Sequence, residues 1–181
     1  KEYSYQFDVS NLDNKPFIKT FGGTGDEHFE KHRVTRDGGV VAVGRTTSSD
    51  GDIGSTNKGG TDALLVKYDQ FGEIEWKKNF GGSKDDFFYN VVQTKDDGFV
   101  AVGVTASNDC DLAGYNVKDN DSIIVKYDKE GKELWKNVFI NKGILERIFQ
   151  IEEGLDGNLY MVNEKHLLNN TSNDTVIEKR D

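Results

Sequence analysis

The sequence predicts an all-β protein built from repeated units, and three observations support this class. The 181 residues include 20 glycines and a single proline beside many Phe and Tyr residues, as expected of short strands joined by tight turns. Apolar residues do not recur at helical spacing over any long window, so no helix is predicted. Strand-like segments also recur along the chain at a constant interval.

The interval between the first copies of the repeat is 59 residues. Phe21-Gly22-Gly23 recurs as Phe80-Gly81-Gly82, since 80 − 21 = 59. Residues 174–181 resemble residues 121–128 in a third copy, at a shorter distance of 181 − 128 = 53. The sequence therefore contains part of one unit, two whole units and a shortened third unit.

Each whole unit is predicted to contain four strands. In the first unit they cover residues 30–35, 40–46, 62–68 and 73–80, and in the second unit 88–94, 99–105, 121–127 and 132–139. The first and third connections are tight turns, of which Asp69-Gln70-Phe71-Gly72 has the Asp and Gly of a type I turn closed by a left-handed glycine. The second connection is a long polar loop, at residues 47–61 and 106–120.

Four short antiparallel strands at this period are typical of the blades of a β-propeller. Neighbouring blades cover both faces of each blade, which explains why residues 40–43 are apolar without alternation. A two-sheet sandwich is the alternative, and it explains the short strands but not the repeat. The expected fold is an all-β, β-propeller-like array of four-stranded antiparallel blades in about three repeats.

In this interpretation a single domain covers residues 1–181. Residues 1–23 form a partial blade, 24–82 and 83–141 form two whole blades, and 142–181 form a degenerate partial blade. Propellers use ~4–8 blades, so the chain is expected to be a fragment of a larger propeller or to self-associate to close the ring. Within one chain, strands at residues 3–9 and 17–21 are expected to pair with the last unit, whose third strand is placed at 175–181.

Five motifs mark the repeat. They are Gly22-Gly23 followed by Asp26, Asp37-Gly38-Gly39, Ser49-Asp50-Gly51-Asp52, the segment from Asp62 to Asp69, and Gly72 followed by Trp76. In this combination the units resemble the propeller-like repeats of extracellular bacterial surface proteins and lipoproteins. The Gly and Trp pair also resembles the tryptophan docking motif of quinoprotein propellers. The third unit lacks the Asp-rich loop and the Gly-Gly exit. The resemblance implies a bacterial cell-surface or extracellular location, and binding more than chemistry.

The charge of the chain narrows the classes of partner. The formal charge is -9, from 32 acidic and 23 basic residues. This balance disfavours nucleic acid and anionic membranes, which both attract a surplus of Lys and Arg. No apolar run is long enough to span a bilayer, so no membrane insertion is expected. Proteins, neutral glycans and cations remain compatible partners.

The long loops and the connections between units fall at one end of the predicted strands, and this end is acidic. The carboxylates proposed as calcium ligands are Asp50, Asp52 and Asp62 in the first unit and Asp109, Asp111 and Asp121 in the second. An Asp-x-Asp pair with a third Asp supplies the oxygen ligands that calcium prefers. The alternative is that these side chains close the loops by hydrogen bonds to the backbone. Phe87, Phe88 and Tyr115 are the aromatic candidates for ligand binding at this end.

No arrangement of residues predicts catalysis. Trp76 and Trp135 are interpreted as packing between units, with carbohydrate stacking as the alternative. The predicted function is a non-enzymatic extracellular or cell-surface module, for binding or as a scaffold, that presents the acidic loop end to a protein or glycan. The alternatives are part of a quinoprotein-like or glycan-active enzyme whose site lies in other blades, and a purely structural spacer.

Overall fold

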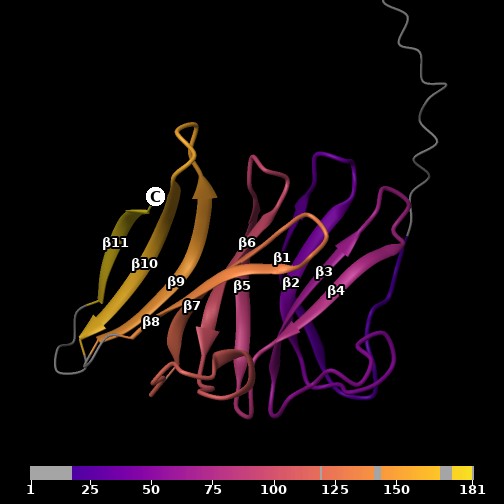
Figure 1. Ribbon diagram of the computed structural model, residues 1–181, viewed down its shortest axis with the longest axis horizontal. Helices are drawn as coiled ribbons and strands as arrows, with labels where there is room; N and C mark the ends of the chain where they lie inside the picture. Colours follow the sequence, from indigo (N-terminus) through magenta and orange to yellow (C-terminus); the bar gives the residue numbers. More distant parts are fainter. Residues whose placement is uncertain (1–17, 119, 141–143, 168–172, 181) are drawn as a thin grey trace, which may run out of the picture.

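The computed structural model describes residues 18–118, 120–140, 144–167 and 173–180. It contains eleven β-strands in three antiparallel sheets, so the predicted all-β class is confirmed (Figure 1). Two sheets have four strands and one has three, and the sheets do not close into a ring within the described residues. A short 3-10 helix, η1 (Cys110–Leu112), is the one helical element in this part of the chain, and it was not predicted.

The strands of each sheet follow one another in sequence order. The first sheet contains β1 (Glu27–Val34), β2 (Val40–Thr46), β3 (Asp62–Tyr68) and β4 (Ile74–Phe80). The second contains β5 (Asp86–Gln93), β6 (Phe99–Thr105), β7 (Asp121–Tyr127) and β8 (Glu133–Phe139). The third contains β9 (Ile144–Glu153), β10 (Leu159–Leu167) and β11 (Asn173–Arg180).

The first strand of each whole unit begins earlier than predicted because it contains a β-bulge. In β1 the register shifts between Phe29 and Lys31, and in β5 it shifts between Phe88 and Asn90. The extra residue breaks the alternation that marks a strand in the sequence. A Cβ on Gly44, opposite the first bulge, would lie 1.8 Å from the backbone oxygen of His28, so a glycine is required there.

The third unit supplies the first three strands of the repeat. β11 begins at Asn173, close to the third strand predicted at residues 175–181. The predicted strand at residues 3–9 lies outside the described residues. Residues 18–21 form no strand and do not pair with the third sheet. They lie instead beside the first sheet, where the Lys19 ammonium meets Glu73 at 2.6 Å.

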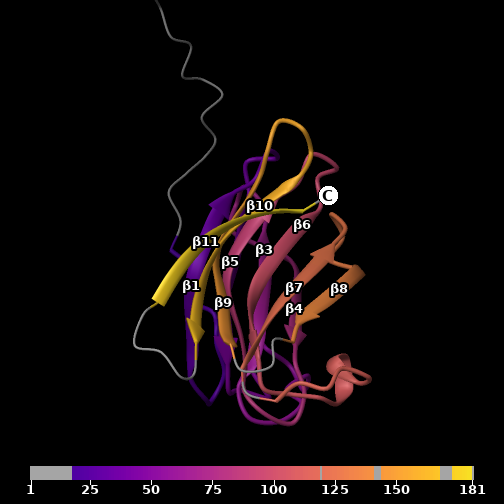
Figure 2. The same cartoon turned by 90° about the vertical axis from the view of Figure 1, so that its left-hand side faces the viewer.

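The three sheets lie face to face (Figure 2). One apolar core lies between the first and second sheets and another between the second and third. Val41 and Leu65 of the first sheet belong to the same core as Phe88 of the second sheet. Val102 of the second sheet shares a core with Ile148 of the third. Every residue of β6 is therefore buried, which explains why residues 99–104, the equivalent of 40–45, are mostly apolar without alternation.

Candidate functional site

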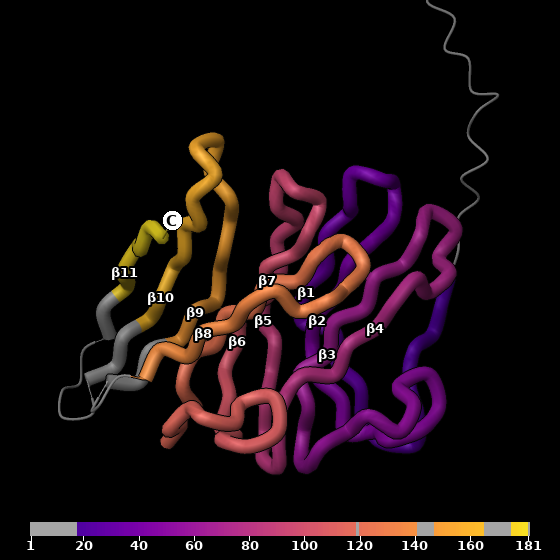
Figure 3. Tube along the Cα trace, in the orientation of Figure 1, coloured from indigo at the N-terminus to yellow at the C-terminus, as the bar shows by residue number. Residues whose placement is uncertain are grey.

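The connections between strands divide the molecule into two ends. Tight turns follow β1, β3, β5 and β7, and the long loops and unit-to-unit connections lie at the opposite end (Figure 3). The loop end consists of residues 22–26, 47–61, 81–85 and 106–118. Four candidate calcium ligands lie in it, and the other two, Asp62 and Asp121, begin β3 and β7 beside it. The tight-turn end contains a cleft between the first and second sheets.

At the loop end, the Asp-x-Asp carboxylates accept hydrogen bonds from the backbone of the Gly-Gly connection. Gly22 N donates to Asp52 Oδ2 at 3.0 Å, and Thr24 N donates to Asp50 Oδ1 at 2.8 Å. The second unit repeats these bonds at 3.0 Å from Gly81 to Asp111 and at 2.8 Å from Ser83 to Asp109. These four carboxylates therefore fasten each connection to the long loop of the following sheet.

The third pair of candidate ligands lies where β3 and β7 begin. Asp62 Oδ2 accepts from the backbone of Lys58 at 3.0 Å, and Asp121 Oδ2 accepts from Lys118 at 3.3 Å. Asp62 is buried, and its Oδ1 has no hydrogen-bond partner. Desolvation raises the pKa of Asp62 to about 6. The hydrogen bond from Lys58 and its charge lower this pKa, and the negative charges of Asp86 and Asp111 oppose that lowering.

Across the first and second units, the Lys58 ammonium binds Asp111 Oδ2 at 2.5 Å. Asp62 and Asp111 therefore lie near each other with a lysine charge between them. No three His, Cys, Asp or Glu side chains are arranged to hold a metal ion within the described residues. This geometry favours the loop-closing interpretation of the acids, and calcium binding stays a prediction.

The three aromatic candidates for ligand binding all contact other side chains or backbone groups of the chain. Phe88 is fully buried and stacks on Phe80 with ring centroids 5.6 Å apart, so its assignment as a ligand-binding residue is corrected to a core role. The bulge after Phe88 turns its side chain toward the first sheet. Phe87 lies under the Arg45 guanidinium at 5.4 Å, and the Tyr115 hydroxyl donates to the Lys136 carbonyl at 3.0 Å.

A cleft of about 650 Å³ opens at the tight-turn end, between the first and second sheets. It combines two aromatic residues with a group of charged and amide side chains. The lining residues are Arg36, Asp37, Lys67, Glu75, Trp76, Gln93, Asp97, Phe99, Lys129 and Glu130. The aromatic surface and the hydrogen-bonding groups therefore meet in one concave site, which is the usual form of a small-ligand site.

Trp76 fixes the wall of the cleft to the next unit. Its Nε1 donates to the Lys129 carbonyl at 2.9 Å, and its ring meets Phe99 edge-on with centroids 5.5 Å apart. Gly131 packs so closely on the ring that a Cβ there would lie 2.7 Å from Cδ2 of Trp76. The predicted packing between units is confirmed for Trp76. Trp135 is 44% exposed, because the described part of the third unit contains no equivalent turn.

Lys67 places a buried ammonium at the base of the cleft. Its side chain is 3% exposed and forms ion pairs with Asp37 at 2.9 Å and Glu75 at 2.6 Å. Desolvation opposes ionisation of Asp37, but hydrogen bonds from Thr35 and Lys67 outweigh it and lower the pKa of Asp37 to about 2. The second and third units repeat the pair as Lys126 with Asp96 and Lys179 with Asp156, at 2.7 and 2.9 Å.

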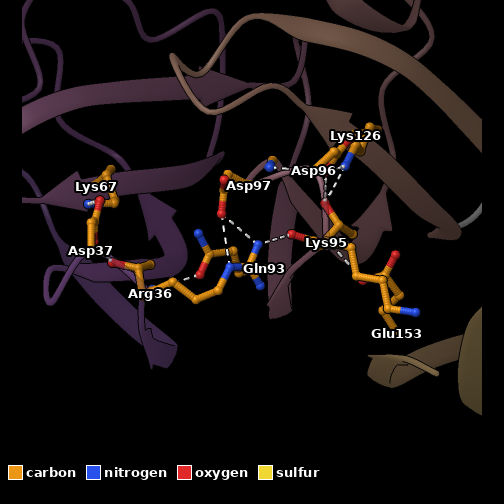
Figure 4. Close-up of polar contacts among 12 residues, drawn as sticks. Arg36, Asp37, Lys67, Gln93, Lys95, Asp96, Asp97, Lys126 and Glu153 are labelled. Carbon is orange, nitrogen blue, oxygen red and sulfur yellow. Dashed lines mark hydrogen bonds and ion pairs between the residues drawn. The ribbon is translucent and has the colours of Figure 1, made fainter. Parts of the chain in front are cut away.

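Arg36 crosses from the first sheet to the second along the rim of the cleft (Figure 4). Its Nε donates to Asp97 Oδ1 at 2.9 Å, and its backbone N–H donates to Gln93 Oε1 at 2.9 Å. An equivalent bond joins the second sheet to the third, where Lys95 N donates to Glu153 Oε2 at 2.7 Å. Hydrogen bonds between units therefore hold the rim side chains in place before any ligand arrives.

Sequence reasoning missed this cleft because it expected function in the long loops. The available signal was a lysine at the same position of each predicted third strand, Lys67 and Lys126, next to a fully buried apolar run. A lysine in such a strand needs an acidic partner at the strand end, and that partner comes from the neighbouring tight turn.

No protein-family model matches the sequence, and no curated protein matches it. Among the described residues, no helix combines the length and apolar character that crossing a membrane would require.

Proposed function

We propose that the chain is a non-enzymatic binding module and that the cleft beside Trp76 binds a neutral saccharide. In this proposal the three sheets are blades of a β-propeller-like array. The resemblance of the repeats favours an extracellular or cell-surface location in a bacterium. The observation that carries the proposal is a half-buried indole in a cleft whose rim consists of fixed hydrogen-bonding side chains.

The composition of the cleft suits a polyhydroxylated ligand without strong charge. Four acidic side chains (Asp37, Glu75, Asp97 and Glu130) face three basic ones (Arg36, Lys67 and Lys129). Their charges nearly cancel, so the cleft does not favour a strongly anionic or cationic ligand. Carboxylates, a guanidinium and an amide can together donate and accept hydrogen bonds with sugar hydroxyls. An indole presents apolar surface to the C–H groups of a sugar ring.

The cleft residues are also held in position, which lowers the entropy cost of binding. Glu75 is fixed by the buried Lys67 at 2.6 Å, and Arg36 is fixed by Asp97 at 2.9 Å. Glu130 is different, because its side chain is 67% exposed and reaches the cleft from the turn between β7 and β8. Glu130 is therefore the cleft acid whose removal changes the ligand surface with the least effect on the fold.

The test uses the two tryptophans of the chain. A Trp135→Phe variant leaves Trp76 as the only indole and therefore as a reporter of the cleft. We would titrate it with soluble oligomers of glucose, mannose, xylose and N-acetylglucosamine and follow the fluorescence, then measure the heat of binding by calorimetry. At least one oligomer is expected to shift the emission of Trp76 in a saturable way.

Two further variants separate the cleft from the rest of the surface. Glu130→Ala is expected to weaken binding about tenfold, because losing a hydrogen bond to a charged group costs about 1.4 kcal/mol or more. Asp26→Ala removes an exposed acid at the loop end and is the matched control, with unchanged affinity expected. The absence of both a spectral shift and binding heat across the panel at millimolar concentration would refute the proposal and favour a spacer.

A further inference from the structure

We infer that a second copy of this chain completes the third sheet, with residues 18–21 of one copy forming the fourth strand beside β11 of the other. The first two sheets have four strands, whereas the third has three within the described residues. β11 is the edge of that sheet and pairs with β10 alone. An edge strand offers a row of backbone donors and acceptors to an incoming strand.

The occupant is a segment of this chain that has the sequence position of a fourth strand but no sheet. Residues 18–21 precede Gly22-Gly23 as β4 precedes Gly81-Gly82, and Phe21 corresponds to Phe80. Ile18 is nevertheless 96% exposed, and residues 18–21 pair with no strand of the described chain. The segment lies beside the first sheet, at the opposite end of the stack from β11 (Figure 1).

The repeat fixes the register of the proposed pairing. In the second sheet, Ser122 pairs with Phe139 and Ile123 pairs with Val138. The corresponding pairs between two copies are Thr175 with Phe21 and Val176 with Thr20. Because side chains alternate along a strand, this register also fixes which side chains face the next sheet.

The outer face of the third sheet resembles the faces that the first and second sheets present to the sheet that follows them. Leu65 and Ile124 occupy the same position in β3 and β7, face the following sheet, and are 0% and 4% exposed. Their equivalent in β11 is Ile177, which is 77% exposed. The third sheet therefore presents an apolar side chain at the position that the other two sheets bury against a neighbour.

The outer face of the first sheet is only partly covered, by Phe21, which packs on Leu64 and Val66 and lies 5.7 Å from the ring of Phe29. Phe88 and Ile148 face the preceding sheet and are fully buried in the two cores. Their equivalent in β1 is Phe29, which is 38% exposed. Stacking the first sheet of one copy on the third sheet of another would bury Phe29 and Ile177 in an interface of the same kind as the two within the chain.

The strand count favours two copies. The eleven strands and the added segment make three sheets of four, so two copies make six such sheets. Rings of four-stranded sheets usually contain ~4–8 members. Reciprocal exchange between two copies would close such a ring and pair the edge of β11 in each copy, as in other exchanges of an identical element between protomers.

The first test is the mass of the full chain in solution, measured by sedimentation and by light scattering. A species of twice 20.3 kDa is expected. Ile177→Lys should convert it to the monomer, because the charge would enter the proposed interface. Leu155→Lys is the matched control, since Leu155 is fully exposed in a turn away from the interface, and it should remain dimeric.

The second test remains decisive if Ile177→Lys fails to fold. In a Cys110→Ser background, Thr20→Cys with Val176→Cys places two thiols directly opposite each other between copies, and oxidation should give a cross-linked dimer. Thr20→Cys with Glu164→Cys is the off-register control and should stay uncrosslinked. A 20.3 kDa species without cross-links, or a ladder of open oligomers, would overturn the inference.

Discussion

Replacing Gly131 with alanine tests the contact that joins the first two units. Gly131 has φ +76°, and a Cβ there would lie 2.7 Å from Cδ2 and 2.8 Å from Cε3 of Trp76. The left-handed backbone costs an alanine about 1–2 kcal/mol. The indole must also move, which strains the packing by about 1–3 kcal/mol and weakens a hydrogen bond to the Lys129 carbonyl worth about 1 kcal/mol.

Gly157 provides a matched control for the backbone cost. It has φ +83° in the turn between β9 and β10, but nothing lies within 4 Å of the position that its Cβ would occupy. Gly157→Ala should therefore cost only the backbone contribution, about 1–2 kcal/mol. The free energy of unfolding should therefore fall by about 2 kcal/mol more in Gly131→Ala than in Gly157→Ala.

Urea denaturation followed by circular dichroism gives both free energies of unfolding from the transition midpoints and slopes. In a Trp76→Ala background, the extra cost of Gly131→Ala should vanish, because the two residues are in contact and their effects are not additive. Equal destabilisation by the two glycine variants, or an extra cost that persists without Trp76, would refute the docking of Trp76 on this turn.

Three further predictions concern the buried and paired carboxylates. The pKa of Asp62 is raised from 3.8 to about 6, so folding favours its protonated form, and the stabilisation from that form is present below about pH 4 and lost as the pH rises through 6. Asp62→Asn, which stays neutral, should therefore unfold at a higher urea concentration than wild type at pH 7 but not at pH 4. Asp111→Ala should destabilise by about 1–2 kcal/mol because it removes the acceptor of Gly81 N and Lys58 Nζ, equally with and without 1 mM calcium, whereas a calcium-dependent difference in melting temperature would support the metal hypothesis. Asp96 has a pKa lowered to about 2 by its bonds to Lys126 and Thr94, which outweigh desolvation, so its stabilisation is present above 3.8 and is lost as pH falls toward 2; Asp96→Asn should lower the melting temperature at pH 7 and leave it unchanged at pH 2.

The fold was largely predictable because the repeat encodes it in residues with local roles. Asp69 and Gly72 form a turn in which Asp69 Oδ1 accepts from Phe71 N and Glu73 N, each at 2.8 Å. The same side chains recur in the second unit, so two copies of the motif predict each strand boundary. The bulges in β1 and β5 could not be read, because a bulge depends on pairing with the neighbouring strand.

The candidate site was not predictable, because its residues come together only when two units stack. Arg36 and Gln93 are far apart in sequence, and neither belongs to a recognisable motif. The Asp-x-Asp pairs attracted attention because acids in Gly-rich loops can bind calcium. In the structure Asp50 and Asp52 hold the backbone of the preceding connection, a role that depends on the conformation of that connection.

Comparison of the two sheet-to-sheet interfaces distinguishes residues that recur in each whole unit from cleft residues that occur only between the first and second sheets. Lys67 and Trp76 recur as Lys126 and Trp135, so these residues belong to the architecture of both whole units. Other cleft residues do not recur.

Glu75 corresponds to Leu134, Phe99 to Leu159 and Asp97 to Gly157, so the interface between the second and third sheets lacks these acids and the aromatic floor. In the proposed site, this unrepeated set adds its side chains to a repeated frame that includes Trp76. Because Trp76 lines the cleft beside this set and Trp135 does not, Trp76→Phe should abolish saccharide binding, whereas Trp135→Phe should leave it unchanged. Binding that survives Trp76→Phe would place the ligand elsewhere on the molecule.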